Sequence, residues 1–145
     1  MFLVPKPNRP DDPYRPVIDV RAPNAAAEID SYTIPLIDDL ITRQGQKHIW
    51  SKLDLKDAFS QIPLASEARP IFKITTPLGD FQPTIMPQGY CNAPSIFQRE
   101  MDHCLQPVEN IANAYFDDII SGTKKGEKET EEELIWKHYA DLRQV

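Results

Sequence analysis

The segment NAYFDDIISG, residues 113–122, constrains the fold most strongly, because two adjacent carboxylates stand between apolar, β-prone arms. An aromatic pair precedes the carboxylates and an isoleucine pair follows them. This pattern predicts a β-hairpin with Asp117 and Asp118 at or near its turn. A carboxylate in an apolar setting is costly unless something offsets its charge. The segment therefore indicates antiparallel strands and a partner for the two aspartates.

The rest of the chain mixes short strands and helices without a regular alternation, which favours an α+β domain with a mostly antiparallel sheet and helices on one face. Five prolines within residues 1–16 predict an extended or irregular start. Apolar periodicity, prolines and glycines predict the remaining elements. The expected strands cover residues 16–20, 48–56 and two short segments around PLGD, and the expected helices cover about 35–45, 92–107 and 127–145.

Two of the expected helices have features that the structure can test. Asn92 suits the N-cap of the helix over 92–107, and Pro94 suits its first turn. In the last helix, acidic residues fill the first turns, and the spacing predicts that Ile135, Tyr139 and Leu142 face inward.

Composition fits one modest soluble domain of 145 residues. The net charge of -6 argues against a nucleic-acid binder, because such proteins normally carry a basic excess. Two cysteines match neither a zinc pattern nor a disulfide framework, so we expect a reducing, intracellular compartment. No apolar run has the length of a membrane span, and the N-terminus lacks the pattern of a signal peptide.

Three Asp-Asp pairs are candidates for chemistry. The pair at residues 11–12 lies among prolines and reads as a solvated loop, and the pair at 38–39 reads as the polar face of a helix. Asp117 and Asp118 leave two interpretations open, a plain turn or a metal site. Asp54 favours the metal site, because it too stands between apolar residues of an expected strand.

Strands that place Asp54 beside Asp117 and Asp118 would gather three carboxylates. Carboxylate oxygens are the hard ligands that Mg²⁺ prefers. Such a set suits two-metal phosphoryl or nucleotidyl transfer, in which one metal activates the attacking oxygen and the other steadies the leaving pyrophosphate.

Five blocks, in order, resemble reverse transcriptases. YFDD at 115–118 resembles their Tyr-x-Asp-Asp box, and SKLDLKDAFSQIPL at 51–64 resembles the strand with their first catalytic aspartate. MPQGYCNAPSIFQREM at 86–101 resembles their Pro-x-Gly-x-x-x-x-Pro-x-x-Phe-Gln segment. YRPVIDVRAPN at 14–24 and YTIPLIDDLI at 32–41 resemble a fingers segment and the next helix. The amino-acid sequences of these blocks most resemble those of gypsy-type LTR retrotransposon and retroviral polymerases.

The resemblance implies that Asp54, Asp117 and Asp118 are catalytic and bind Mg²⁺, with Mn²⁺ as an alternative. Tyr115 would support the hairpin near the primer terminus, and Phe116 would touch the template-primer backbone.

The resemblance also assigns a nucleotide pocket. Arg15 aligns with the arginine that holds the incoming triphosphate, a task suited to the bidentate guanidinium. Phe59 aligns with the bulky residue that excludes ribose 2′-hydroxyls, and Gln88 and Gly89 align with the nucleotide-pocket Gln-Gly. Each of these residues also has a purely structural alternative. Arg15 would form a surface salt bridge, Phe59 would be a core aromatic residue, and Gln88 and Gly89 would belong to a plain loop.

Other basic residues receive weaker assignments. Lys6 or Arg9 could reach the terminal phosphate of the nucleotide. Lys124 and Lys125 are expected to be solvated. The three histidines show no paired spacing and receive no role: His48, His103 and His138.

The implied fold is a polymerase palm-type antiparallel sheet with helices on one face, plus partial fingers. Residues 1–145 would form one partial reverse transcriptase domain, fingers-like over about 1–50 and 60–95 and palm-like over about 51–59 and 96–145. Family members continue further, so we expect the thumb and ribonuclease H regions to belong to a larger polyprotein.

Three functions remain open from the sequence. The first is an RNA-directed DNA polymerase core that acts on an RNA or DNA template-primer and dNTPs, without a membrane partner. The second is a truncated, catalytically inactive retroelement remnant or interaction module. The third is an unrelated Mg²⁺-dependent phosphohydrolase.

Overall fold

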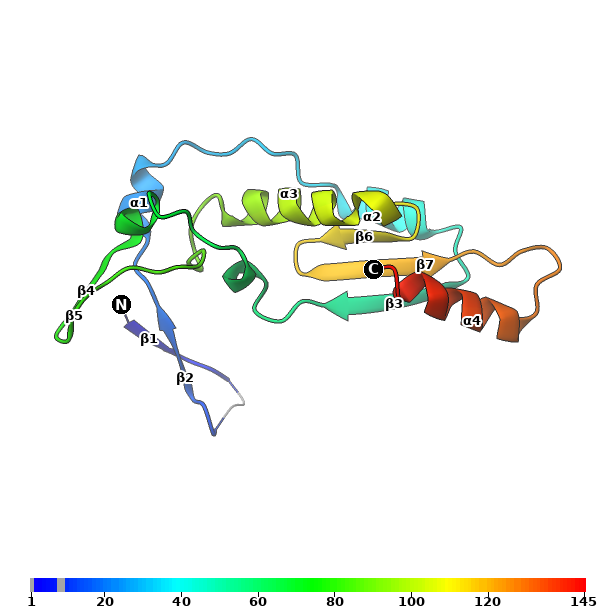
Figure 1. Cartoon of the computed structure of the whole chain (residues 1–145), viewed down its shortest axis with the longest axis horizontal. Helices are drawn as coiled ribbons and strands as arrows, with labels where there is room; N and C mark the ends of the chain where they lie inside the picture. The colour runs from blue at the N-terminus through cyan, green and yellow to red at the C-terminus, as the bar shows by residue number, and fades with distance from the viewer. Residues whose placement is uncertain (1, 8–9) are drawn as a thin grey trace. The chain divides into compact units, whose positions relative to one another are not determined.

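The computed structural model describes residues 2–7 and 10–145, and the chain divides into two compact units. The first unit extends to residue 30 and includes 57–93, and the second comprises 31–56 and 94–145. Helices and antiparallel strands occur together, which confirms the predicted α+β class (Figure 1). Within the described residues, no helix is long and apolar enough to cross a membrane.

The first unit contains two antiparallel hairpins. Strand β1 (Phe2–Pro5) pairs with β2 (Tyr14–Val17), and β4 (Ile74–Thr76) pairs with β5 (Gly79–Phe81). Three short helices complete it: α1 (Arg21–Ala26) and the 3₁₀ turns η1 (Ala58–Gln61) and η2 (Arg69–Phe72).

The hairpin β4–β5 confirms the two strands expected around PLGD, but the start of the chain differs from its prediction. Of the extended or irregular start that was expected, residues 2–5 take the extended form and pair as a strand, and the strand expected at 16–20 ends at Val17. Prolines are tolerated here because β1 and β2 form a two-stranded sheet, in which each strand is an edge.

The side chain of Asn92 forms hydrogen bonds to the backbone of the segment before residue 31. Its Nδ2 donates to the Glu28 carbonyl at 2.7 Å, and its Oδ1 accepts from the Asp30 amide at 3.1 Å. Asn92, which directly precedes α3, therefore joins these segments, and its capping of the helix stays a prediction.

The second unit is built on a three-stranded antiparallel sheet in the order β3-β7-β6. Its strands are β3 (Ile49–Asp54), β6 (Ala112–Tyr115) and β7 (Asp118–Thr123). The helices α2 (Ile37–Gln44), α3 (Ala93–Leu105), η3 (Gln106–Val108) and α4 (Glu131–Leu142) accompany it, close to the predicted ranges.

The two faces of this sheet differ in burial. The residues of β6 and β7 that share one face are all buried: Ala112, Ala114, Ile119, Ser121 and Thr123. On the opposite face, Lys52 and Asp54 are exposed and Asp118 is half-buried. Helix α4 packs against β7 and β3 (Figure 1). The more open face therefore carries the charged residues.

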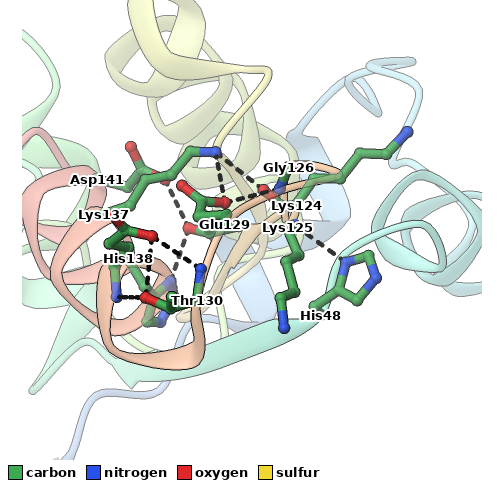
Figure 2. Close-up of polar contacts among 11 residues, drawn as sticks. His48, Lys124, Lys125, Gly126, Glu129, Thr130, Lys137, His138 and Asp141 are labelled. Atoms are coloured by element: carbon green, nitrogen blue, oxygen red, sulfur yellow. Dashed lines mark hydrogen bonds and ion pairs between the residues drawn. The ribbon is translucent and has the colours of Figure 1, made fainter.

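Helix α4 begins with a capping box. The Thr130 side chain accepts from the Glu133 amide, and the Glu133 carboxylate accepts from the Thr130 amide at 2.8 Å. In Figure 2, Thr130 lies at the start of this helix, and Glu129 lies within reach of the Lys137 ammonium. The hydrogen bonds from Thr130 lower the pKa of Glu133 below its ordinary value.

The predicted inward face of α4 is wrong for Ile135 and Tyr139, whereas Leu142 is half-buried. Ile135 and Tyr139 are 58% and 55% exposed, whereas Leu134 and His138 are buried at 4% and 6%. Positions 134 and 138 are four residues apart and therefore share a helix face. The helix is rotated by about one residue because His138 forms hydrogen bonds to the sheet.

Gly122 allows α2 and the following loop to approach β7 closely. A Cβ at this position would lie 2.4 Å from Gln44 Oε1 and 2.9 Å from Lys47 Cγ. Gln44 is buried, so its amide has little room to move away. The absence of a side chain at residue 122 is therefore a packing requirement.

We expect Gly122→Ala to destabilise the chain by about 1–3 kcal/mol, the usual cost of overpacking. Urea denaturation followed by circular dichroism measures this change. Gly126→Ala is the matched control, because a Cβ there meets no atom closer than 3.5 Å. Equal stability of the two variants would contradict the packing role of Gly122.

Candidate active site

Asp117 and Asp118 lie at the tip of the β6–β7 hairpin, as predicted. Strand β6 ends at Tyr115 and β7 begins at Asp118, so Phe116 and Asp117 form the turn. Asp117 is exposed and Asp118 is half-buried. The apolar surroundings inferred from the sequence are thus wrong for Asp117, because the turn carries this residue out of the packed part of the strands.

Asp54 lies directly opposite Asp118. Strands β3 and β7 are neighbours, and their register pairs the two aspartates across the ladder. The Leu55 amide donates to the Asp117 carbonyl at 2.9 Å, which extends the pairing by one step into the turn. The expected juxtaposition of Asp54 with the Asp-Asp pair is therefore present at one end of the sheet.

Lys52 stands among these carboxylates. Its Nζ lies 2.8 Å from Asp118 Oδ2. The hydrogen bond that Lys52 donates to Asp118 raises the pKa of Lys52 above its ordinary value, and the charges of Asp54 and Asp117 act in the same direction. No sequence pattern assigned a role to Lys52, although its position two residues before Asp54 places both on one strand face.

The carboxylates have the right chemistry for a divalent cation but are not gathered as a ligand set. Among residues 2–7 and 10–145, no group of three or more His, Cys, Asp or Glu side chains is arranged to hold a metal ion. The oxygens of Asp54, Asp117 and Asp118 nevertheless suit Mg²⁺, and Asp118 already pairs with one cation, the Lys52 ammonium.

Gln98 fixes the hairpin turn from below. Its Oε1 accepts from the Phe116 amide at 2.8 Å, and its Nε2 donates to the Ala114 carbonyl at 3.0 Å. Nε2 also lies 2.8 Å from Asp102 Oδ1. Gln98 is fully buried. This one side chain therefore pairs with the outer edge of β6 as a neighbouring strand would.

The Gln98 contacts coincide with an unusual backbone conformation. Phe116 has a φ of 53°, one of two positive values among the described non-glycine residues. Such a conformation is unfavourable for a residue with a Cβ and persists where surrounding contacts hold it. Gln98 was quoted within the Phe-Gln motif but received no role. A glutamine on the apolar side of a helix was the signal that could have identified it.

Tyr115 and Phe116 form an edge-to-face ring pair beside the aspartates. Their ring centroids are 4.7 Å apart, and both residues are half-buried. Tyr115 also lies opposite Asp118 in the β6–β7 register. The two residues predicted to meet the primer and template thus flank the carboxylates.

The nucleotide-pocket candidates belong to the first unit. Arg15 is exposed on β2, Phe59 is half-buried in η1, and Gln88 and Gly89 are exposed. Gly89 has a φ of 89°, which L side chains rarely adopt. Their roles in nucleotide binding stay predictions.

Asn24 holds the Gln-Gly segment in place within this unit. Its Nδ2 donates to the Gly89 carbonyl at 2.9 Å, and its Oδ1 accepts from the Cys91 amide at 2.9 Å. This residue of the DVRAPN block received no individual role from the sequence. Lys6 forms an ion pair with Asp12, and Arg9 lies outside the described residues.

Asp54 and Asp118 face each other at one end of two adjacent strands, and Asp117 lies on the hairpin turn beside them. This arrangement is typical of the palm domains of nucleotidyl-transferring enzymes. The family model described as "Reverse transcriptase (RNA-dependent DNA polymerase)" matches residues 4–144. The chain therefore belongs to the reverse transcriptase family, which is metal-dependent. This membership rules out the unrelated phosphohydrolase.

Similar curated proteins are long viral polyproteins. The "Enzymatic polyprotein" of Cauliflower mosaic virus (strain NY8153) is 38% identical over 106 residues, which cover 73% of this chain and 16% of the relative. The "Putative enzymatic polyprotein" of Cassava vein mosaic virus is 38% identical over 110 residues, covering 76% and 17%. The chain thus spans less than a fifth of the length of these relatives.

Solved structures show the same fold. Foamy viral protease-reverse transcriptase in complex with double-stranded DNA matches with a TM-score of 0.78 and 24% identity, over 99% of this chain and 23% of that one. Foamy viral protease-reverse transcriptase in complex with RNA/DNA hybrid matches with a TM-score of 0.71 and 23% identity, over 98% and 18%. The expected polymerase fold is confirmed.

Proposed function

We propose that this chain is the fingers-palm core of an RNA-directed DNA polymerase that transfers nucleotides to a primer 3′-OH. The observation that carries the proposal is the pairing of Asp54 with Asp118 across β3 and β7, with Asp117 on the adjoining turn, in a member of the reverse transcriptase family.

The three aspartates would hold Mg²⁺, or Mn²⁺ in its place. When bound, the metal supplies charge neutralisation at the transferred phosphate and activation of the attacking hydroxyl. The aspartates orient this chemistry because the ladder fixes Asp54 and Asp118, and the Leu55 amide and Gln98 support the turn. Tyr115 and Phe116 would then contact the primer and template.

The remaining candidates would recognise the incoming dNTP. Arg15 has an exposed guanidinium suited to bidentate phosphate contacts. Phe59 would exclude the ribose 2′-hydroxyl, and Gln88 and Gly89 would form the pocket wall that Asn24 supports.

We further propose that the first unit corresponds to fingers and the second largely to palm, within a longer polyprotein that supplies a thumb and a ribonuclease H region. An RNA or DNA template-primer would be its partner, and its location would be intracellular. The free thiols of Cys91 and Cys104 are consistent with a reducing compartment.

Primer extension on poly(rA)/oligo(dT) with the purified chain tests the polymerase proposal, with Mg²⁺ or Mn²⁺ present. The expected result is primer extension by the unmodified chain and none detectable from an Asp117→Asn, Asp118→Asn variant. Mutating residues that only hydrogen-bond to metal ligands typically lowers activity by about 10–100-fold, so loss of the ligands themselves should cost more. Extension that survives in this variant would contradict the site.

No extension from a folded sample would favour the inactive remnant or interaction module. Circular dichroism establishes that the sample is folded. A direct Mg²⁺ titration then separates a chain that binds metal without polymerising from one that has lost the metal site.

A further inference from the structure

We infer that the Lys52 ammonium pairs with Asp118 when the aspartate site holds no metal, and that a divalent metal must displace it in order to bind. The inference rests on the proposed metal site and adds a residue that sets the affinity of that site. Lys52 would act by competition and by holding Asp118 in place, as a positioning residue.

The strand geometry brings Lys52 to the aspartates. Lys52 and Asp54 are two residues apart on β3, so their side chains share a sheet face. Asp118 lies opposite Asp54, which makes it the diagonal neighbour of Lys52. Long side chains span such diagonals, and the Lys52 ammonium reaches Asp118 Oδ2 at 2.8 Å.

The arrangement explains why the carboxylates are not gathered as a ligand set. A single ammonium has a charge of one and bonds directly to Asp118. A divalent cation would attract all three aspartates more strongly and draw their oxygens inward. The aspartates thus share one end of the sheet, and Asp118 is paired with a lysine instead of being gathered with the others around a metal.

The exchange requires no unfolding. The side chains of Lys52 and Asp118 are 64% and 36% exposed, so the ammonium can leave into water. Ion pairs with this exposure contribute little net stability. The Lys52–Asp118 pair is therefore weak enough to give way to a cation of higher charge.

Isothermal titration of Mg²⁺ into the full chain tests the inference. Lys52→Met is expected to bind Mg²⁺ about three- to tenfold more tightly, because the competing ammonium is gone and exposed ion pairs have modest strength. Lys52→Arg keeps the charge and should bind Mg²⁺ no more tightly than the unmodified chain. Circular dichroism checks that each variant is folded.

Lys73→Met is the matched control. Lys73, directly before β4, pairs with Asp80 of β5 at 2.6 Å, and the two side chains are 48% and 49% exposed. This variant has the same net charge as Lys52→Met. Equal tightening in both variants would show a general charge effect and overturn the inference.

Two further outcomes separate this inference from the proposed function. If the unmodified chain binds Mg²⁺ and Lys52→Met binds it with the same affinity, Lys52 is not a competitor and only the inference fails. If no variant binds Mg²⁺ at millimolar concentration, the metal site itself fails. Release of the lysine can also be followed by NMR of the Lys52 side chain, whose signal should shift on Mg²⁺ addition.

Discussion

Replacing Gln98 by leucine is expected to destabilise the chain by about 4 kcal/mol and to reduce primer extension further than the loss of folded protein explains. Leucine has a similar size but cannot pair with the Phe116 amide or the Ala114 carbonyl. Each buried backbone group left without a partner costs about 1–3 kcal/mol. The stability change follows from urea denaturation.

The effect on activity has a separate cause. Without Gln98, the Phe116 amide loses the hydrogen bond that accompanies its positive φ, so we expect the turn to relax and to carry Asp117 away from Asp54. A displacement of about 1 Å at a catalytic group can reduce the rate by about 100-fold. The rate constant for primer extension at saturating nucleotide, measured at a temperature where the variant is folded, reports this displacement.

Gln106→Leu provides the matched control, because Gln106 is exposed after the end of α3. The same substitution there should change stability by less than about 0.5 kcal/mol. If Gln98→Leu lost activity only in proportion to its unfolded fraction, the glutamine would support folding but would not position Asp117.

Elements specified by neighbouring residues could be predicted from the sequence. The hairpin around Asp117 follows from two β-prone arms and a polar turn, and Gly45 ends α2 as its position suggested. Helix α3 has Pro94 in its first turn and an apolar stripe that is largely buried. Each of these features depends on residues that are close together in the sequence, so the predictions did not require knowledge of the tertiary contacts.

The side chains that organise the site could not be predicted in this way. Gln98 and Phe116 are 18 residues apart, and Lys52 meets Asp118 only because β3 pairs with β7. Their contacts depend on register, which hydrophobic patterning alone did not give. Strand β1 was missed for a related reason, because prolines disfavour central strands but are accepted in a two-stranded sheet.

The rotation of α4 shows how a polar residue can mislead an apolar pattern. Ile135 and Tyr139 suggested an inward face, but these side chains are exposed and His138 is buried. Hydropathy ranks isoleucine and tyrosine as better core residues than histidine. His138 nevertheless lies on the buried face of α4, because its ring forms hydrogen bonds to Ser51 on β3 and Thr123 on β7.

These partners define how the His138 ring binds the sheet. Thr123 Oγ1 donates to Asp141 Oδ2 at 2.5 Å, so it is available to His138 Nδ1 only as an acceptor, at 2.9 Å. Nδ1 therefore donates to Thr123, and Nε2 is hydrogen-bonded to Ser51 Oγ at 2.8 Å. His138 and Asp141 are labelled on α4 in Figure 2. The ring thus joins α4 to both β3 and β7.

His138→Phe is accordingly expected to destabilise the chain by about 2 kcal/mol, although an aromatic ring is retained and apolarity increases. The buried Thr123 hydroxyl would lose its donor, and Ser51 Oγ would lose its hydrogen-bond partner, at a cost of about 1–3 kcal/mol for an unsatisfied group. Urea denaturation measures the change. Tyr139→Phe, at an exposed position of the same helix, should be neutral within about 0.5 kcal/mol.

A His138→Phe variant as stable as the unmodified chain would mean that apolar packing alone holds α4 against the sheet. The expected loss would instead show that the hydrogen bonds select this helix face over the one with Ile135 and Tyr139. Proteolysis gives an independent readout, because an α4 released from β7 and β3 exposes the chain beyond Thr123 to cleavage. Faster cleavage there, with β3 and β7 still paired, would locate the effect of His138 in the docking of α4.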